Sequence, residues 1–68
     1  MIKIRHYRRK RGLTQTKLAK YLGVSSQTLS NWERGLTEPD IQSLCSLSSI
    51  LRVSIDSLLE SFMPKKKR

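Results

Sequence analysis

The sequence predicts a small all-α domain in which five short helices pack as one compact bundle. Apolar residues recur at the three- and four-residue spacing of amphipathic helices, and no stretch alternates as a strand does. A capping pattern occurs three times: an apolar residue, then Ser or Thr, then an apolar residue four positions further on. Glycines follow three of the predicted helices, where a left-handed residue is favoured. With 68 residues, the chain has room for one domain and one modest core.

The helices are expected at residues 2–10, 15–22, 26–34, 41–51 and 55–62. Four of them begin after a residue whose side-chain oxygen can accept from a free amide of the first turn. These capping residues are Thr14, Ser25, Asp40 and Ser54. The glycines at the helix ends are Gly12, Gly23 and Gly35. The predicted core consists of Ile4, Tyr7, Leu13, Leu18, Ala19, Leu22, Val24, Leu29, Trp32, Ile41, Leu44, Leu47, Ile50, Leu51, Ile55, Leu58 and Leu59.

The single cysteine, Cys45, excludes an internal disulfide and a cysteine-based zinc site. It shares a predicted helix face with Ile41 and Leu44, and we therefore expect a core thiol rather than a redox sensor.

No paired carboxylates, metal cluster or activated nucleophile are present, so we expect no enzyme activity, no cofactor and no metal. His6 has no second ligand and is expected to be exposed. No apolar run is long enough for a membrane span or a signal region, which favours a cytoplasmic protein.

Positive charge is concentrated in the N-terminal half of the chain. The net charge is +9, of which residues 1–34 carry +8 (nine basic residues, one acidic). Residues 35–63 carry −3 (one basic, four acidic), and the tail, residues 64–68, adds +4. This asymmetry indicates a polyanionic partner that contacts the N-terminal half. The alternatives are a basic face that is merely solvated and a membrane surface. The basic helices carry polar rather than bulky apolar residues on their exposed faces, which disfavours the membrane.

A helix-turn-helix is predicted from Gln15 to Arg34. Only residues 23–25 separate its two helices, so the helices must cross at a steep angle. Ala19 allows the close approach, and Gly23 adopts a positive φ without a steric cost. Trp32 lies on the inner face of the second helix and is expected to pack in the core rather than to stack on bases.

The spacing of these residues resembles that of the phage-repressor (Cro/repressor, XRE-like) helix-turn-helix family. The similar segments are residues 4–8, 12–15, 18–19, 22–24, 31–35, 39–41 and 51–56, and together they extend over nearly the whole chain. The resemblance implies the five-helix lambda-repressor-like fold, double-stranded DNA as partner, and a bacterial, phage or mobile-element origin.

The outer face of the second helix of this motif carries short polar side chains. At about 100° per residue, Ser26, Gln27, Ser30, Asn31 and Arg34 project to one side, opposite the apolar residues. Gln and Asn can bond the N6 and N7 edge of adenine, and Ser can bond several bases. We therefore expect Ser26, Gln27, Ser30 and Asn31, here called the polar stripe, to contact base edges.

The resemblance further implies phosphate contacts and one internal ion pair. Gln15 is similar to the family's phosphate-binding glutamine, and Arg8 and Glu33 are similar to an ion pair that joins the first and third helices. The expected phosphate-contacting residues are Thr14, Gln15, Ser25, Arg34 and Lys10. The sequence departs from the family in one segment, because residues 36–40 are acidic where many relatives are basic. A side-chain phosphate clamp is therefore not expected there, although backbone amides could serve.

The predicted function is that of a homodimeric transcriptional repressor that recognises a palindromic operator. The alternative is an antitoxin-type module that binds a small protein partner and represses its own operon. Residues 1–63 are expected to form the domain, with Phe62 and Met63 near the dimer surface. The basic tail, residues 64–68, is expected to be disordered and to add non-specific attraction to DNA.

Overall fold

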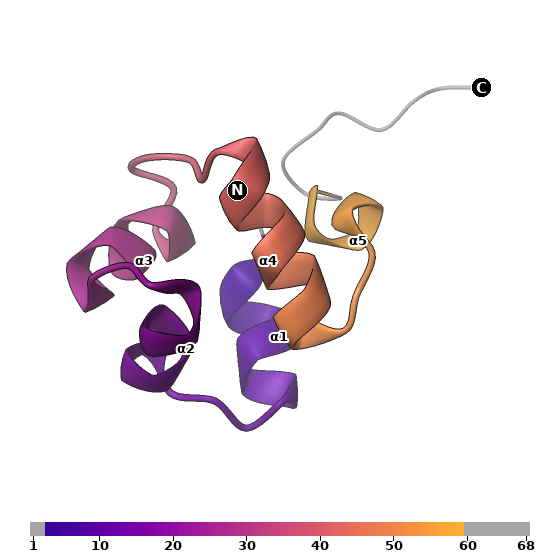
Figure 1. The fold of residues 1–68 in the computed structure, drawn as a ribbon, viewed down its shortest axis with the longest axis horizontal. Helices are drawn as coiled ribbons and strands as arrows, with labels where there is room; N and C mark the ends of the chain where they lie inside the picture. Colours follow the sequence, from indigo (N-terminus) through magenta and orange to yellow (C-terminus); the bar gives the residue numbers. More distant parts are fainter. Residues whose placement is uncertain (1–2, 60–68) are drawn as a thin grey trace.

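The computed structural model describes residues 3–59, and over that range the chain folds into five α-helices (Figure 1). The helices are α1 (Ile4–Lys10), α2 (Gln15–Leu22), α3 (Ser26–Glu33), α4 (Ile41–Leu51) and α5 (Ile55–Leu59). No strand occurs among the residues described. In Figure 1, α2 and α3 lie on one side and α5 on the other, with α1 and α4 between them. The predicted all-α, five-helix architecture is confirmed.

Helices α2 to α5 begin where the sequence predicts, because a capping side chain accepts a hydrogen bond from the amide three residues later. These bonds run from the amides of Lys17, Thr28, Ser43 and Ser57 to the side chains of Thr14 (3.1 Å), Ser25 (3.0 Å), Asp40 (3.2 Å) and Ser54 (3.0 Å). The hydrogen bonds from Ser43 also hold the pKa of the exposed Asp40 carboxyl below its ordinary value. Each cap is a contact within one turn, which is why its position follows from local sequence.

Three helix boundaries differ from the prediction or lie beyond it. Helix α1 begins at Ile4, two residues later than expected, and the amide of Lys3 instead donates to the carbonyl of Leu58 in α5 at 3.1 Å. Helix α3 ends at Glu33, with Arg34 as its C-cap. The predicted end of the last helix, residue 62, lies outside the described residues, as does the basic tail.

The residue that ends α4 was not anticipated from the sequence. Its C-cap is Arg52, with φ 59° and ψ 46°, the left-handed conformation that glycine adopts without steric cost. At the ends of the first three helices, glycines hold positive φ as expected. The sequence carries no glycine after α4, so nothing in the local pattern identified this strained position.

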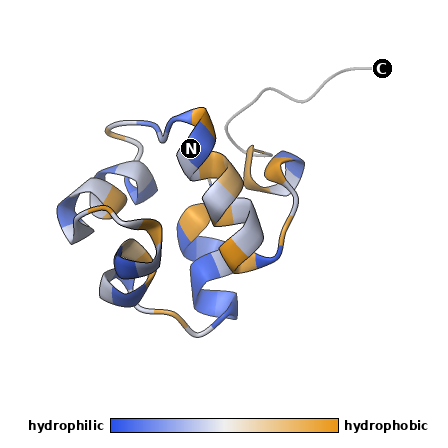
Figure 2. Cartoon of the chain, in the orientation of Figure 1, coloured by the Kyte–Doolittle hydropathy of each residue, from blue (hydrophilic) through white to orange (hydrophobic). Residues whose placement is uncertain are grey.

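The core lies where the helices face one another. Its buried apolar residues are Ile4, Leu18, Ala19, Leu29, Trp32, Leu47, Leu51 and Leu58, with Tyr7, Leu13, Leu22, Val24, Leu44, Ile50, Val53 and Leu59 partly buried against them. In Figure 2, each helix carries both apolar and polar residues around its ribbon, as an amphipathic helix does. The predicted core is confirmed except for Ile41 and the partly buried Ile55, neither of which belongs to this cluster, and Val53 is an addition.

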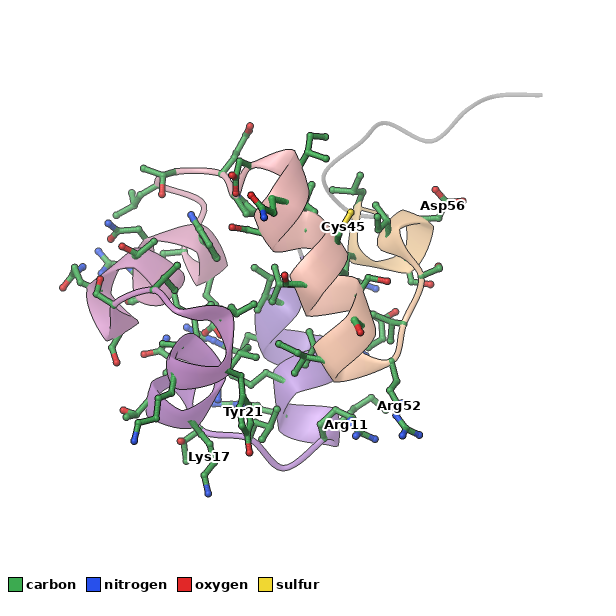
Figure 3. All side chains as sticks on the ribbon, viewed as in Figure 1. Arg11, Lys17, Tyr21, Cys45, Arg52 and Asp56 are labelled. Atoms are coloured by element: carbon green, nitrogen blue, oxygen red, sulfur yellow. The ribbon has the colours of Figure 1, made fainter. Side chains whose placement is uncertain are left out.

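Two residues of α4 were wrongly predicted to lie in the core. Ile41 is 75% exposed, and Cys45 is exposed one turn later (Figure 3). At about 100° per residue, Cys45 lies roughly 160° from Leu47, the deepest residue of the helix, and Ile41 lies roughly 120° from it. Both therefore stand on the outer side of α4. The prediction was wrong because it was based on the apolar character of these two side chains.

Candidate nucleic-acid interface

The turn between α2 and α3 brings the outer face of α3 to the surface in a fixed orientation. Gly23 ends α2 with φ 76°, and the amide of Val24 donates to the carbonyl of Ala19 at 3.0 Å. Ala19 is only 2% exposed, so its small side chain lies within the contact between the helices. On the inner side of α3, Leu29 and Trp32 are buried in the core. These contacts turn the opposite side of the helix outward, away from the core.

The polar stripe of α3 lies on that outer side. Ser26 and Gln27 are exposed, whereas Ser30 and Asn31 are partly exposed. Gln27 Nε2 donates to Asn31 Oδ1 at 3.0 Å, so the two longest side chains of the stripe are joined. The structure thus brings together the four residues predicted to contact bases.

The start of α2 lies beside the end of α3. Thr14 caps α2 through Lys17, which leaves the amides of Gln15 and Thr16 unused by the helix itself. Gln15 is half-buried, and its Nε2 donates to Oε1 of Glu33 at 3.0 Å. One amide hydrogen and the carbonyl oxygen of Gln15 remain for another partner. An anion at this helix end would meet backbone amides and the Gln15 side chain together.

Glu33 is the centre of a buried network that joins three helices. Arg8 Nε donates to Glu33 Oε2 at 2.6 Å and Arg8 Nη2 to Oε1 at 3.2 Å, which is a bidentate pair between α1 and α3. Arg8 Nη1 also donates to the carbonyl of Leu13 at 2.9 Å. Arg5, half-exposed, adds a longer contact of 3.5 Å to Glu33. The network fixes α3 relative to α1 and to the first turn of α2.

The charge state of Glu33 follows from two opposed effects. Burial raises the pKa of its carboxyl, but hydrogen bonds from Arg8 and Gln15, with the positive charge of Arg8, lower it further than burial raises it. The net pKa lies below the ordinary value of a glutamate. Glu33 is therefore an anion throughout the neutral range, matched to a buried cation. Arg8, although basic, is turned inward and unavailable to an external polyanion.

Seven further basic side chains of the N-terminal half are exposed, whereas Lys3 is partly buried. The exposed ones are Arg5, Arg9, Lys10, Arg11, Lys17, Lys20 and Arg34. Figure 3 shows Arg11 and Lys17 projecting from the lower edge of the view, and Arg52 projects there as well, whereas Asp56 lies on α5 at the other side. Arg52 belongs to the half of the sequence that is acidic overall, so charge counting did not associate it with this edge. The exposed basic side chains give the α1–α2 side a positive field.

The loop between α3 and α4 offers less to an anion. Glu38 and Asp40 are exposed. The amides of Leu36 and Thr37 both donate to the carbonyl of Asn31, at 2.9 and 3.5 Å. These two backbone donors, which the sequence left as possible phosphate ligands, are therefore engaged within the loop.

The link between Gln15 and Glu33 was missed by sequence reasoning. Gln15 was assigned to phosphate and Glu33 to the ion pair, as separate functions. The two residues are 18 positions apart, and no spacing rule predicts their contact. Only the packing of α2 against α3 reveals that the predicted phosphate ligand is held by the structural carboxylate.

Comparison with known proteins identifies the family. A helix-turn-helix family model matches residues 4–58. The chain belongs to the XRE-type helix-turn-helix family. Repressor protein C2 of Salmonella phage P22 is 43% identical over 58 residues, which cover 85% of this chain and 27% of that protein. The chain spans about half or less of the length of the curated relatives it matches.

Solved structures of such relatives share the fold. The P22 c2 repressor in complex with a synthetic operator matches with a TM-score of 0.76 at 44% identity, over 81% of this chain and 83% of that one. The complex of the SinR and SinI proteins contains a chain that matches with a TM-score of 0.82 at 40% identity, over 91% of this chain and 63% of that one. The lambda-repressor-like fold expected from the resemblance is confirmed.

Two further findings apply to residues 3–59. No helix in this range is long and apolar enough to cross a membrane. No group of three or more His, Cys, Asp or Glu side chains in this range could hold a metal ion.

Proposed function

We propose that this chain binds double-stranded DNA sequence-specifically as a transcriptional repressor, with α3 in the major groove. The observation that carries the proposal is the polar stripe, an exposed to partly exposed row of hydrogen-bonding side chains on a helix whose other side is buried. Exposed faces of ordinary helices more often carry Glu and Lys pairs. The similarity to a repressor solved on its operator supports the same interpretation. Ser26, Gln27, Ser30 and Asn31 contact base edges in this proposal.

Phosphate contacts position the helix. Thr14, Gln15 and Ser25 lie at the first turns of α2 and α3, where free backbone amides attract a phosphate oxygen. Arg34 follows α3, and Lys10 lies at the end of α1; both are exposed. The buried Arg8–Glu33 pair holds these elements in register, while the other exposed cations contribute attraction that carries no sequence information.

The proposed active form is a homodimer on a palindromic operator. One recognition helix contacts only a few base pairs, so useful specificity requires two half-sites one helical turn, ~34 Å, apart. The residues expected near the dimer surface, Phe62 and Met63, lie outside the described range. We further propose that the protein acts in the cytoplasm of a bacterium, where operator DNA is accessible.

The experiment that tests this proposal is selection of bound sites from random double-stranded DNA. We expect a palindromic consensus with half-sites one helical turn apart, and gel filtration that shows a dimer at high concentration. Recovery of random sequence from repeated rounds would contradict sequence-specific binding. A single unrepeated half-site with a monomeric protein would contradict the homodimer alone.

A protein-binding module is the second candidate function. The observation that favours it is the similarity to SinR in complex with SinI. Leu36 on the α3–α4 loop and Ile41 on α4 provide exposed apolar side chains that a partner could cover. Stable co-purification with a small protein encoded beside this gene, with release of operator DNA, supports this candidate. Loss of that complex in an Ile41→Ser variant would assign the contact to α4.

A further inference from the structure

A hydrogen bond joins the side-chain amides of Gln27 and Asn31 within the polar stripe. The two residues are four positions apart and therefore one above the other on the outer side of α3. Gln27 Nε2 donates and Asn31 Oδ1 accepts, at 3.0 Å, in an exposed environment. A primary amide can rotate by half a turn and exchange its oxygen and nitrogen, but the bond persists only if both amides rotate together. The bond therefore couples the orientations of the two amides.

The joined amides leave a regular series of groups for an external partner, and the series alternates in either joint arrangement. The structure shows one of the two arrangements. Gln27 turns its nitrogen toward Asn31 and its carbonyl oxygen away. Asn31 turns its oxygen toward Gln27 and its nitrogen away. Along the helix the groups therefore alternate: acceptor, donor, acceptor, donor. Each amide keeps at least one oxygen lone pair and at least one N–H that the bond does not use.

We infer that Gln27 and Asn31 act as one specificity-determining unit that selects adenines at two neighbouring positions of the DNA. This inference rests on the proposed binding of α3 in the major groove. Each adenine presents an N6–H donor beside an N7 acceptor, so two adenines on one strand present the complementary alternating series. Guanine presents two acceptors, N7 and O6, and would oppose each amide oxygen with another oxygen.

The bond makes the two base preferences dependent on each other. In a Gln27→Ala variant, Asn31 loses the donor that holds its oxygen in place, and its amide can rotate to suit other bases. In an Asn31→Ala variant, Gln27 loses its acceptor in the same way. Each single substitution therefore weakens discrimination at both positions, whereas independent side chains would each affect one.

The test is a double-mutant cycle with base substitution at each operator position. Wild type, Gln27→Ala, Asn31→Ala and the double variant are titrated against the selected operator, its single-base variants and random DNA. Gln42→Ala, which removes an exposed glutamine from α4, is the matched control. Because Gln27 is exposed and Asn31 partly so, the variants are expected to fold, and thermal melting verifies this before binding is measured.

We expect wild type to prefer adenine at two neighbouring positions and each single variant to lose preference at both. At the base position that the substituted side chain contacts, the preference for adenine over other bases falls roughly 5- to 100-fold. On the operator, the loss of affinity in the double variant is smaller than the product of the losses in the two single variants, by a factor of at least about three. Random DNA shows no such coupling, and Gln42→Ala changes neither preference.

Two results would overturn the inference while leaving DNA binding by α3 intact. One is that each single variant loses base preference at one operator position only, and that the loss of affinity in the double variant equals the product of the two single losses. The other is a preference for guanine at both positions. By contrast, if wild type itself selects no sequence, the proposed function fails, and the inference fails with it.

Discussion

The buried Arg8–Glu33 pair is the contact whose loss should damage the fold most. Glu33 is 4% exposed and Arg8 is 9% exposed, and three donors converge on the carboxylate within 3.2 Å. A Glu33→Ala substitution leaves the guanidinium buried without its counter-charge. Breaking a buried pair from one side costs about 3–5 kcal/mol. A chain of this length has about 3–10 kcal/mol in total, so the loss is a large fraction of the stability.

Thermal unfolding followed by circular dichroism measures this effect. At roughly 4–8 °C per kcal/mol for a small domain, the melting temperature should fall by at least about 12 °C, or the variant should be unfolded at room temperature. Arg5→Ala is the matched control because it removes a half-exposed, 3.5 Å contact to the same carboxylate. Such a pair contributes less than about 1 kcal/mol.

A third variant separates loss of the pair from loss of the charge balance. Replacing both partners with apolar residues of similar size, Arg8→Met with Glu33→Leu, removes the pair without leaving a buried charge. Its stability should exceed that of Glu33→Ala. The reasoning is refuted if Glu33→Ala melts within about 3 °C of wild type, or if Arg5→Ala is equally destabilising.

Three other predictions concern acid stability, the end of α4 and the electrostatic part of DNA binding. Because the folded pKa of Glu33 is lowered, its contribution to stability is complete above the unfolded value of about 4.3 and is lost as pH falls through the folded value. Wild type should therefore lose stability on acidification below about pH 4.3, and Glu33→Gln should lack this component; parallel pH–melting curves for the two would contradict the assignment. Arg52→Gly relieves the left-handed strain at the end of α4 and should stabilise the fold by about 0.5–1 kcal/mol in thermal melts. Arg52→Ala, which keeps the Cβ, should give no gain, and an equal gain in both would exclude strain as the cause. Lys10→Ala should weaken binding to all DNA alike and reduce the slope of log K against log salt by about one. A loss confined to the operator would show that Lys10 contacts bases instead.

The features that the sequence predicted well are those decided within one helical turn. Thr14, Ser25, Asp40 and Ser54 cap their helices through an amide three residues later, and this geometry needs no tertiary context. The buried and exposed sides of α3 also follow from helical periodicity, because Leu29 and Trp32 fix which side is buried.

The features that escaped prediction depend on packing between helices. Cys45 and Ile41 are apolar in sequence, but the neighbours of α4 cover only its other side. Arg52 adopts a left-handed conformation that its residue type does not favour, at a helix end where the amide of Val53 donates to the carbonyl of Ser48. The Gln15–Glu33 bond joins residues 18 positions apart and exists only because α2 packs against α3.

The central proposal, sequence recognition by the polar stripe, is tested most directly by the ratio of operator to random-DNA affinity. This ratio is measured for wild type and Gln27→Ala at the same salt concentration. We predict that Gln27→Ala lowers operator affinity by roughly 5- to 100-fold, equivalent to about 1–3 kcal/mol, and leaves random-DNA affinity unchanged. An equal loss on both kinds of DNA, or no loss on either, would contradict base recognition by α3.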